Sequence, residues 1–255
     1  MEKAIAIVCY GTANRDVWMS SGGQLEEEVR RAYPEWNVEV MFTSRILTER
    51  CRRAGWTVTE VQEGMERLVR QGVRSLVVLP VYLMAGEAFG KVKAAVQSCT
   101  DCQDIRLGIP LLENPDGCRA AAEAIIKEGA PDREETLAAV LHGTRSETAG
   151  ARSHMEAALQ EATQQPALAA VMGEEWQLQE RLMRSCAKKV LLIPLTLMVG
   201  KHAAQDIAGE TPESMRCWLE QKGYAVRSVV KGLLEYSQVR QSWLRQLQRL
   251  IDRWE

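Results

Sequence analysis

Short apolar runs alternate with longer amphipathic stretches along the whole chain. The runs are rich in Val, Ile and Leu, which is typical of strands buried on both faces of a parallel sheet. Between them apolar residues recur every three or four positions, as at Leu25, Val29 and Tyr33, which predicts helices. This alternation predicts an α/β fold of right-handed βαβ units whose sheets are covered by helices. The predicted strands are residues 4–10, 38–42, 75–83, 105–109, 137–141, 168–172, 190–197 and 225–230.

The two halves of the chain resemble each other in three places that occur in the same order. CYGTANRD (9–16) matches LHGTRSET (141–148), VRSLVVLPVYLMAGE (73–87) matches AKKVLLIPLTLMVGK (187–201), and GIPLLEN (108–114) matches GLLEYS (232–237). The matches include Gly, Thr and Pro as well as apolar residues, which argues against chance similarity among strands. The sequence therefore predicts two similar α/β domains, residues 1–130 and 131–255, that face each other across a ligand cleft.

Charge and composition narrow the classes of partner. A net charge of −2 gives no electrostatic reason to expect nucleic acid or an anionic membrane surface. No apolar run reaches the about 18 residues of a membrane span, and residues 4–10 fit a first strand better than a signal peptide. The seven scattered cysteines, with one isolated CxxC at 99–102, are typical of reduced thiols. We expect a cytoplasmic protein, and the sequence leaves open whether it forms a homo-oligomer.

Two of the three histidines follow predicted buried strands. His142 comes directly after the strand 137–141, and His202 follows the strand 190–197 beside Gly200 and Lys201. Open α/β sheets bind their ligands at the carboxyl ends of the strands, and imidazole suits Co, Ni, Fe and Zn. A divalent metal site is one interpretation, and two histidines that each hydrogen-bond a loop are the other. Neither GxGxxG nor a Walker motif is present, so no nucleotide is expected.

Several longer motifs resemble one known family. The segments FTSRILTER (42–50), LPVYLMAGEAFGKV (79–92), LHGTR (141–145) and especially LIPLTLMVGKHAAQDIAGE (192–210) resemble the class II chelatases. Within that family the anaerobic sirohydrochlorin cobaltochelatases of cobalamin biosynthesis are the most similar. The resemblance covers nearly the whole chain. It implies insertion of a divalent metal, without ATP, into a tetrapyrrole held between the two domains.

The resemblance also implies a ligand set for the metal. His142 and His202 match two of the three family ligands, while the position of the third, a glutamate, falls on Met172. Either Glu174 or Glu175 could supply the carboxylate after a loop shift, or Met172 could remain as a thioether neighbour.

The first domain departs from the family as well. Tyr10 stands opposite His142, and Tyr82 stands where the family has a histidine. Glu87 lies beside the family's glutamate position, which is an alanine in this chain.

The chemistry of metal insertion suggests further contacts. Neutral imidazole can bind the metal or accept a pyrrole proton, so we expect His142 and His202 to be catalytic. Met84 and Met198, at matching places in the two halves, are candidate apolar walls for the macrocycle, beside Tyr10, Tyr82, Glu87 and Met172. The nearest cationic candidates for its acidic side chains are Arg45, Arg145 and Lys201.

The sequence supports one function first and leaves others open. We expect insertion of Co²⁺ into sirohydrochlorin. The alternatives are a ferrochelatase or nickel chelatase acting on the same substrate class, a non-catalytic tetrapyrrole- or metal-binding homologue, and a small-ligand binding protein of periplasmic type. Imidazole ligation does not by itself distinguish Co²⁺ from Fe²⁺ or Ni²⁺.

Overall fold

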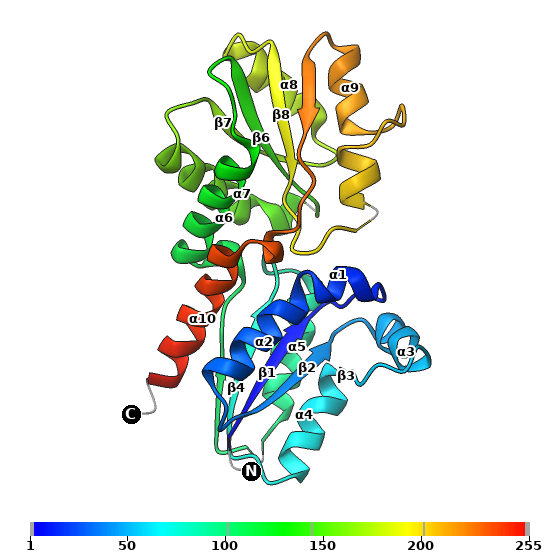
Figure 1. Ribbon diagram of the computed structural model, residues 1–255, viewed down its shortest axis with the longest axis vertical. Helices are drawn as coiled ribbons and strands as arrows, with labels where there is room; N and C mark the ends of the chain where they lie inside the picture. The colour runs from blue at the N-terminus through cyan, green and yellow to red at the C-terminus, as the bar shows by residue number, and fades with distance from the viewer. Residues whose placement is uncertain (1–2, 101, 144, 201, 253–255) are drawn as a thin grey trace. The chain divides into compact units, whose positions relative to one another are not determined.

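Two parallel sheets form the frame of the molecule. The computed structural model describes residues 3–100, 102–143, 145–200 and 202–252. The sheets have the strand orders β3-β2-β1-β4-β5 and β7-β6-β8-β9, and every described pair of strands is parallel (Figure 1). The predicted α/β fold with parallel sheets is confirmed. The strands are β1 (Lys3–Cys9), β2 (Asn37–Phe42), β3 (Thr59–Glu60), β4 (Ser75–Val81), β5 (Asp104–Leu107), β6 (Glu135–Leu141), β7 (Ala167–Val171), β8 (Lys189–Pro194) and β9 (Ala225–Ser228).

Helices connect the strands, as the periodicity predicts. Two short elements have no counterpart in the sequence-based prediction, namely the five-residue helix α1 and the two-residue strand β3. The α-helices are α1 (Arg15–Met19), α2 (Gly22–Ala32), α3 (Arg45–Arg53), α4 (Val61–Arg70), α5 (Glu87–Ser98), α6 (Pro115–Gly129), α7 (Arg145–Ala162), α8 (Glu175–Arg184), α9 (Met215–Gln221) and α10 (Ser237–Asp252). The short helical segments are η1 (Leu111–Glu113), η2 (His202–Ile207) and η3 (Leu233–Glu235).

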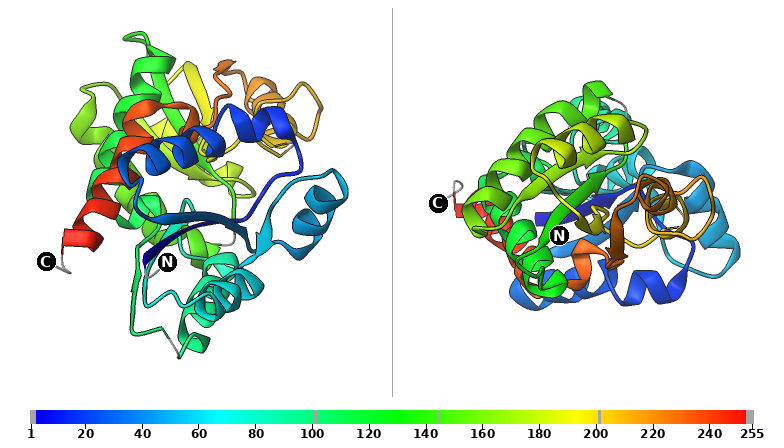
Figure 2. Two further views of the ribbon diagram at one scale, coloured as in Figure 1. Left: turned by 60° about the horizontal axis from the view of Figure 1, so that its bottom comes forward. Right: turned by 90° about the horizontal axis from the view of Figure 1, so that it is seen from above.

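The inner strands β1 and β4 of the first sheet are buried on both faces because they are apolar at successive positions. Ala4, Ala6 and Val8 of β1 pack with Met65 of α4 and Val92 of α5 in one core. The alternate residues of β1 are also buried, and they point to the opposite face. The left view of Figure 2 shows this sheet with the blue helices α1 and α2 on one side and the cyan to teal helices α4 and α5 on the other.

The second sheet follows the same plan. Val140 of β6 and Leu192 of β8 pack with Leu182 of α8 and Leu219 of α9 in a second core. On the other face, Gly129 at the end of α6 lies so close to β8 that an added Cβ would come within 2.7 Å of the Leu191 side chain. A larger residue there would push α6 away from the sheet.

Equivalent backbone hydrogen bonds appear in the two halves of the chain. The N–H of Leu111 donates to the Tyr82 carbonyl at 2.9 Å, and the N–H of Leu233 donates to the Thr196 carbonyl at 2.8 Å. Both donors begin a 3₁₀ helix with the sequence LLE. The glycines after the first strand of each half, at 11 and 143, both have positive φ, 105° and 156°. The matching motifs therefore have matching local structures.

The chain divides into two compact units, one holding the first sheet and the other the second. The breaks lie after Leu111 and after Val239, whereas the sequence comparison divides the chain once, after residue 130. Helix α6 belongs to the second unit, and most of α10 belongs to the first. In α10 the Trp243 Nε1–H donates to the Pro80 carbonyl at 3.3 Å, and the Gln246 Nε2 donates to the Ile109 carbonyl at 3.1 Å. The repeated pattern marks the start of each half but does not reveal which sheet its last helix joins.

Most of the cysteines are buried inside the two units. The Cys102 thiol donates to the Arg74 carbonyl at 3.2 Å, and burial raises its pKa above the ordinary value. Burial raises the pKa of Cys118 to about 11 and that of Cys9 to about 12. A thiol that stays protonated is a poor nucleophile and metal ligand. Among the described residues, no helix has the length and apolar character needed to cross a membrane.

Candidate functional site

His142 follows the central strand of the second sheet. The main chain continues the ladder on both sides of it, because the N–H of Met172 donates to the Leu141 carbonyl at 2.8 Å and the N–H of Leu195 donates to the Val140 carbonyl at 2.7 Å. The carboxyl ends of β7, β6 and β8 are thus fixed side by side, with the exposed His142 at the end of the middle strand. This edge is where open parallel sheets bind ligands.

A tight turn after β7 presents two glutamates near the same edge. Gly173 has a φ of +85°, and the N–H of Glu174 closes the turn by donating to the Val171 carbonyl at 3.1 Å. The Glu174 side chain is only 15% exposed, and its Oε2 lies 3.6 Å from the Arg152 Nη1. The Glu175 Oε1 accepts a hydrogen bond from the Gly173 N–H at 2.9 Å. Glu174 therefore has a cationic partner, while Glu175 caps its own turn.

The loop between β8 and His202 is fixed by the start of the last helical region. The Thr196 and Leu197 carbonyls accept hydrogen bonds from the N–H groups of Leu233 and Leu234, at 2.8 and 3.0 Å. Gly232 makes this approach possible, since an added Cβ would lie 2.8 Å from the Leu197 carbonyl oxygen. The half-buried Met198 lies in the same loop.

His202 begins the π-helix η2, a rare geometry that often marks functional sites. The side chain of His202 and the whole of Lys201 lie outside the described residues. Of the predicted trio, the structure therefore describes the side chains of His142 and Glu174 but not that of His202. Among the residues that the structure describes, no group of three His, Cys, Asp or Glu side chains is arranged to hold a metal ion.

In the first unit the two predicted tyrosines differ in their surroundings. Tyr10, directly after β1, is 57% exposed. Tyr82, after β4, is buried beside Phe89, and its hydroxyl shares a hydrogen bond of 2.9 Å with Thr43 Oγ1. Burial raises the pKa of Tyr82 well above its ordinary range. Tyr10 therefore offers a surface to a ligand, whereas the Tyr82 ring is part of the core.

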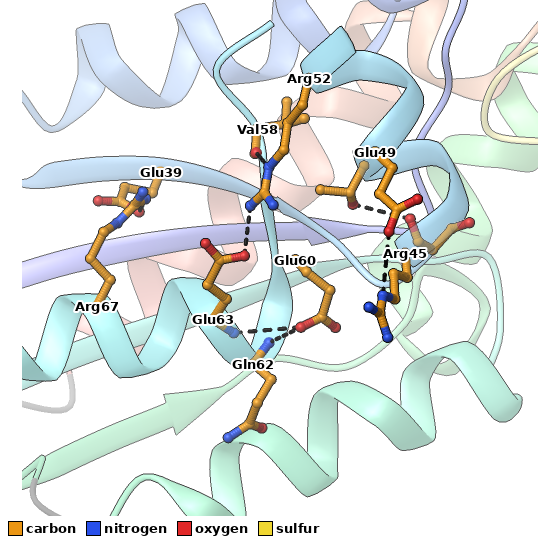
Figure 3. Close-up of polar contacts among 11 residues, drawn as sticks. Glu39, Arg45, Glu49, Arg52, Val58, Glu60, Gln62, Glu63 and Arg67 are labelled. Carbon is orange, nitrogen blue, oxygen red and sulfur yellow. Dashed lines mark hydrogen bonds and ion pairs between the residues drawn. The ribbon is translucent and has the colours of Figure 1, made fainter.

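The other predicted contacts of the first unit lie after the ends of β4 and β2. Met84 is half-buried, and the exposed Glu87 pairs with Lys91 one turn later in α5 at 3.2 Å. Arg45 begins α3 and lies 3.5 Å from Glu49, with its guanidinium exposed (Figure 3). The side chain of Arg145, the equivalent candidate in the second unit, lies outside the described residues.

Arg152 is a partner of Glu174 that the sequence does not reveal. It lies on α7, 22 positions before Glu174, and its Nη1 also donates to the Gln177 Oε1 at 3.2 Å. No spacing or motif links these three residues, because α7 and α8 meet only through the folding of the second unit.

The structure thus brings an exposed imidazole and a partly buried carboxylate to the carboxyl ends of neighbouring strands in the second sheet. The fold is shared with a solved structure described as SirB from Bacillus subtilis with Fe³⁺, at a TM-score of 0.70 and 15% identity, covering 98% of this chain and 96% of the other. The family model described as "Cobalt chelatase (CbiK)" matches residues 3–252. The chain belongs to this cobalt chelatase family.

Two curated relatives match over nearly their full lengths. The sirohydrochlorin cobaltochelatase CbiKC of Nitratidesulfovibrio vulgaris is 25% identical over 258 residues, which cover 98% of this chain and 91% of the relative. The sirohydrochlorin cobaltochelatase of Salmonella typhimurium is 23% identical over 264 residues, covering 99% and 97%. The family resemblance read from the motifs is confirmed.

Proposed function

We propose that the protein inserts Co²⁺ into sirohydrochlorin in the cytoplasm, without a nucleotide, as a step of anaerobic cobalamin biosynthesis. The observation that carries this proposal is the place of His142, exposed at the end of the central strand in a chain of the cobalt chelatase family. The names of the two curated relatives supply the substrate. The scattered cysteine content supports a reducing compartment.

The chemistry requires a group that is both a ligand and a base. A planar tetrapyrrole loses two pyrrole protons when it takes up the metal, and the aqueous metal ion loses water. Neutral imidazole binds Co²⁺ through a ring nitrogen and accepts a proton near neutral pH. In this proposal the neutral imidazoles of His142 and His202 bind the incoming ion, and each ring nitrogen that releases the ion to the macrocycle is then free to accept one of the two pyrrole protons.

Glu174 is the proposed third ligand in place of the glutamate that the family has at position 172. Its carboxylate lies close to Arg152, which balances the charge while no metal is bound. Glu175 is the weaker candidate because its carboxylate already accepts the Gly173 N–H. The main-chain hydrogen bond from the Met172 N–H to the Leu141 carbonyl holds Met172 next to His142. In this proposal the Met172 thioether contacts the macrocycle.

The remaining contacts to the macrocycle are proposed from the sequence. Met198 supplies an apolar surface in the loop after β8, and Lys201 a cation for the carboxylates of the substrate. From the first unit we propose contacts through Tyr10, Met84 and Glu87. Tyr82 is proposed to support them indirectly, since its ring is buried and its hydroxyl is held by Thr43.

An anaerobic absorbance assay tests the proposal. Sirohydrochlorin is mixed with Co²⁺, Fe²⁺ or Ni²⁺ and catalytic amounts of the wild type or of His202→Ala. We expect many turnovers with Co²⁺, the largest ratio of catalysed to uncatalysed rate for Co²⁺, and loss of turnover in the variant. Stoichiometric binding without turnover would indicate a carrier instead of an enzyme. A larger rate ratio with Fe²⁺ or Ni²⁺ would reassign the metal.

A further inference from the structure

A cavity lies at the outer edge of the first sheet, beside β2. Strand β3 pairs only with Met41 and Phe42, so residues 37–40 of β2 have no outer neighbour among the described strands. A cavity of about 450 Å³ occupies this edge between β2, helices α1, α2 and α4, and the segment 55–59. Its volume is within the range of small-molecule sites, about 300–1,000 Å³.

The charged lining of the cavity has an excess of guanidinium groups. Arg15, Arg30 and Arg67 line it together with two carboxylates, Glu26 and Glu39. Glu26 Oε1 accepts from the Nη2 of Arg30 at 2.8 Å, and Glu39 binds the Nη2 of Arg67 (Figure 3). Each carboxylate is therefore already paired with an arginine. The cavity thus favours an anion over a metal cation.

Two of the three arginines retain donors for a ligand. The Nε of Arg67 is buried and has no hydrogen-bond partner in the described structure. Arg15, exposed at the start of α1, forms no ion pair in the described part of the chain. The Arg67 side chain as a whole is 40% exposed, so its guanidinium and that of Arg15 can both donate to an anionic ligand in the cavity.

Two indole rings contribute to the apolar part of the lining, beside Met19 and three valines. Trp18 is held in place by an edge contact with Phe42, with ring centroids 5.7 Å apart, and by close packing against Gly22. Trp56, in the segment before β3, is half-buried and also lines the cavity. Indole and guanidinium faces both stack on planar π-systems.

We propose that this cavity binds a small planar aromatic carboxylate. The carboxylate pairs with Arg67 and Arg15, and the ring lies against Trp18 and Trp56. The planar fork of arginine matches the two oxygens of a carboxylate, which a spherical anion does not offer. The site is built from residues that have no part in metal insertion, so its occupation and the chelatase activity can be measured separately.

Binding of 2-naphthoate followed by calorimetry tests the proposal, with 2-naphthylmethanol as the neutral analogue and inorganic phosphate as a non-aromatic anion. The test variants are Arg15→Gln and Arg67→Gln. The control is Arg53→Gln on α3, whose side chain is 81% exposed and does not line the cavity. We expect one naphthoate per chain. Each test variant should bind about tenfold more weakly, as the loss of a charged hydrogen bond predicts, and the control should change by less than about twofold.

Three results would overturn the proposal. The first is equal binding of the neutral analogue, which would remove the role of the guanidinium groups. The second is unchanged binding in Arg15→Gln, a variant at an exposed position that is expected to fold normally. The third is phosphate binding as tight as naphthoate binding, which would indicate a general anion site without a role for the tryptophans.

Discussion

Replacing Arg227 by glutamine removes one member of an ion pair that braces the second unit. Arg227 on β9 donates from Nε and Nη2 to the two carboxylate oxygens of Glu135, at 2.5 and 2.7 Å, and Nη2 also donates to the Gly129 carbonyl at 2.7 Å. Glu135 is the first residue of β6, and Gly129 is the last residue of α6. The guanidinium therefore connects three elements of the unit that carries His142.

The expected loss of stability follows from burial. Glu135 is 6% exposed, whereas the Arg227 side chain is 43% exposed. Breaking a fully buried pair costs about 3–5 kcal/mol, and breaking an exposed pair costs about 0.2–1 kcal/mol. Because one partner is buried and the other is partly in water, we expect a loss of about 2 kcal/mol in the free energy of unfolding at pH 7.

The pH dependence provides an internal check. The hydrogen bond from Arg227 is the largest cause that lowers the pKa of Glu135 below the ordinary value. A lowered carboxyl pKa gives stability that is present above the unfolded pKa of about 4.3 and is lost as the pH falls through the folded pKa. The difference between the wild type and Arg227→Gln should therefore shrink in acid.

Urea unfolding of both proteins at pH 7 and in acid measures these effects. Lys189→Gln is the matched control, because Lys189 forms an exposed ion pair of 2.6 Å with Glu134 at the same end of the sheet. We expect the control to lose less than about 1 kcal/mol. A loss in Arg227→Gln no larger than in the control, or one that does not depend on pH, would refute the reasoning.

Two further predictions concern the metal site and its supporting loop. Glu174→Gln should weaken Co²⁺ binding by about tenfold or more in a calorimetric titration, because a charged carboxylate ligand becomes neutral. The control Glu175→Gln should change the binding by less than about threefold. Equal effects of the two variants would remove Glu174 from the ligand set. Gly232→Ala should cost about 1–3 kcal/mol of stability in thermal unfolding and slow metal insertion, because the added Cβ would lie 2.8 Å from the Leu197 carbonyl oxygen. The control Gly90→Ala, in an open position of α5, should instead stabilise the protein by about 0.5–1 kcal/mol. If Gly232→Ala left the stability unchanged, the loop at Leu197 would be able to move away from the added Cβ, and the reasoning would fail.

The longer strands could be predicted because parallel strands buried on both faces are apolar at every position. The prediction extends β4 and β8 too far, to residues 83 and 197, while the ladders end at Val81 and Pro194. Leu195 still donates to the Val140 carbonyl of β6, but the carbonyls of the next two residues accept from Leu233 and Leu234 instead of from a strand. Strand β3 has only two residues and α1 only five, too few for a periodic pattern.

The parts of the candidate site that depend on local sequence could be predicted. A histidine directly after a buried strand is visible in the sequence, and His142 lies there in the structure. The Arg152–Glu174 pair is not visible, because Arg152 lies on α7 and Glu174 in the turn before α8, 22 positions later. Which unit α6 and α10 join likewise depends on tertiary packing, because their apolar faces could cover the sheet of either unit.

The most direct test of the central role of His142 is the rate of Co²⁺ insertion by His142→Ala, with His154→Ala as the control. His154 is an exposed imidazole on α7 whose Nδ1 lies 2.8 Å from the Leu112 carbonyl oxygen, so its removal deletes a histidine away from the edge of the sheet. Circular dichroism of both variants is the control for folding. We predict that insertion is abolished in His142→Ala and retained in His154→Ala. Wild-type turnover by a folded His142→Ala protein would contradict the account.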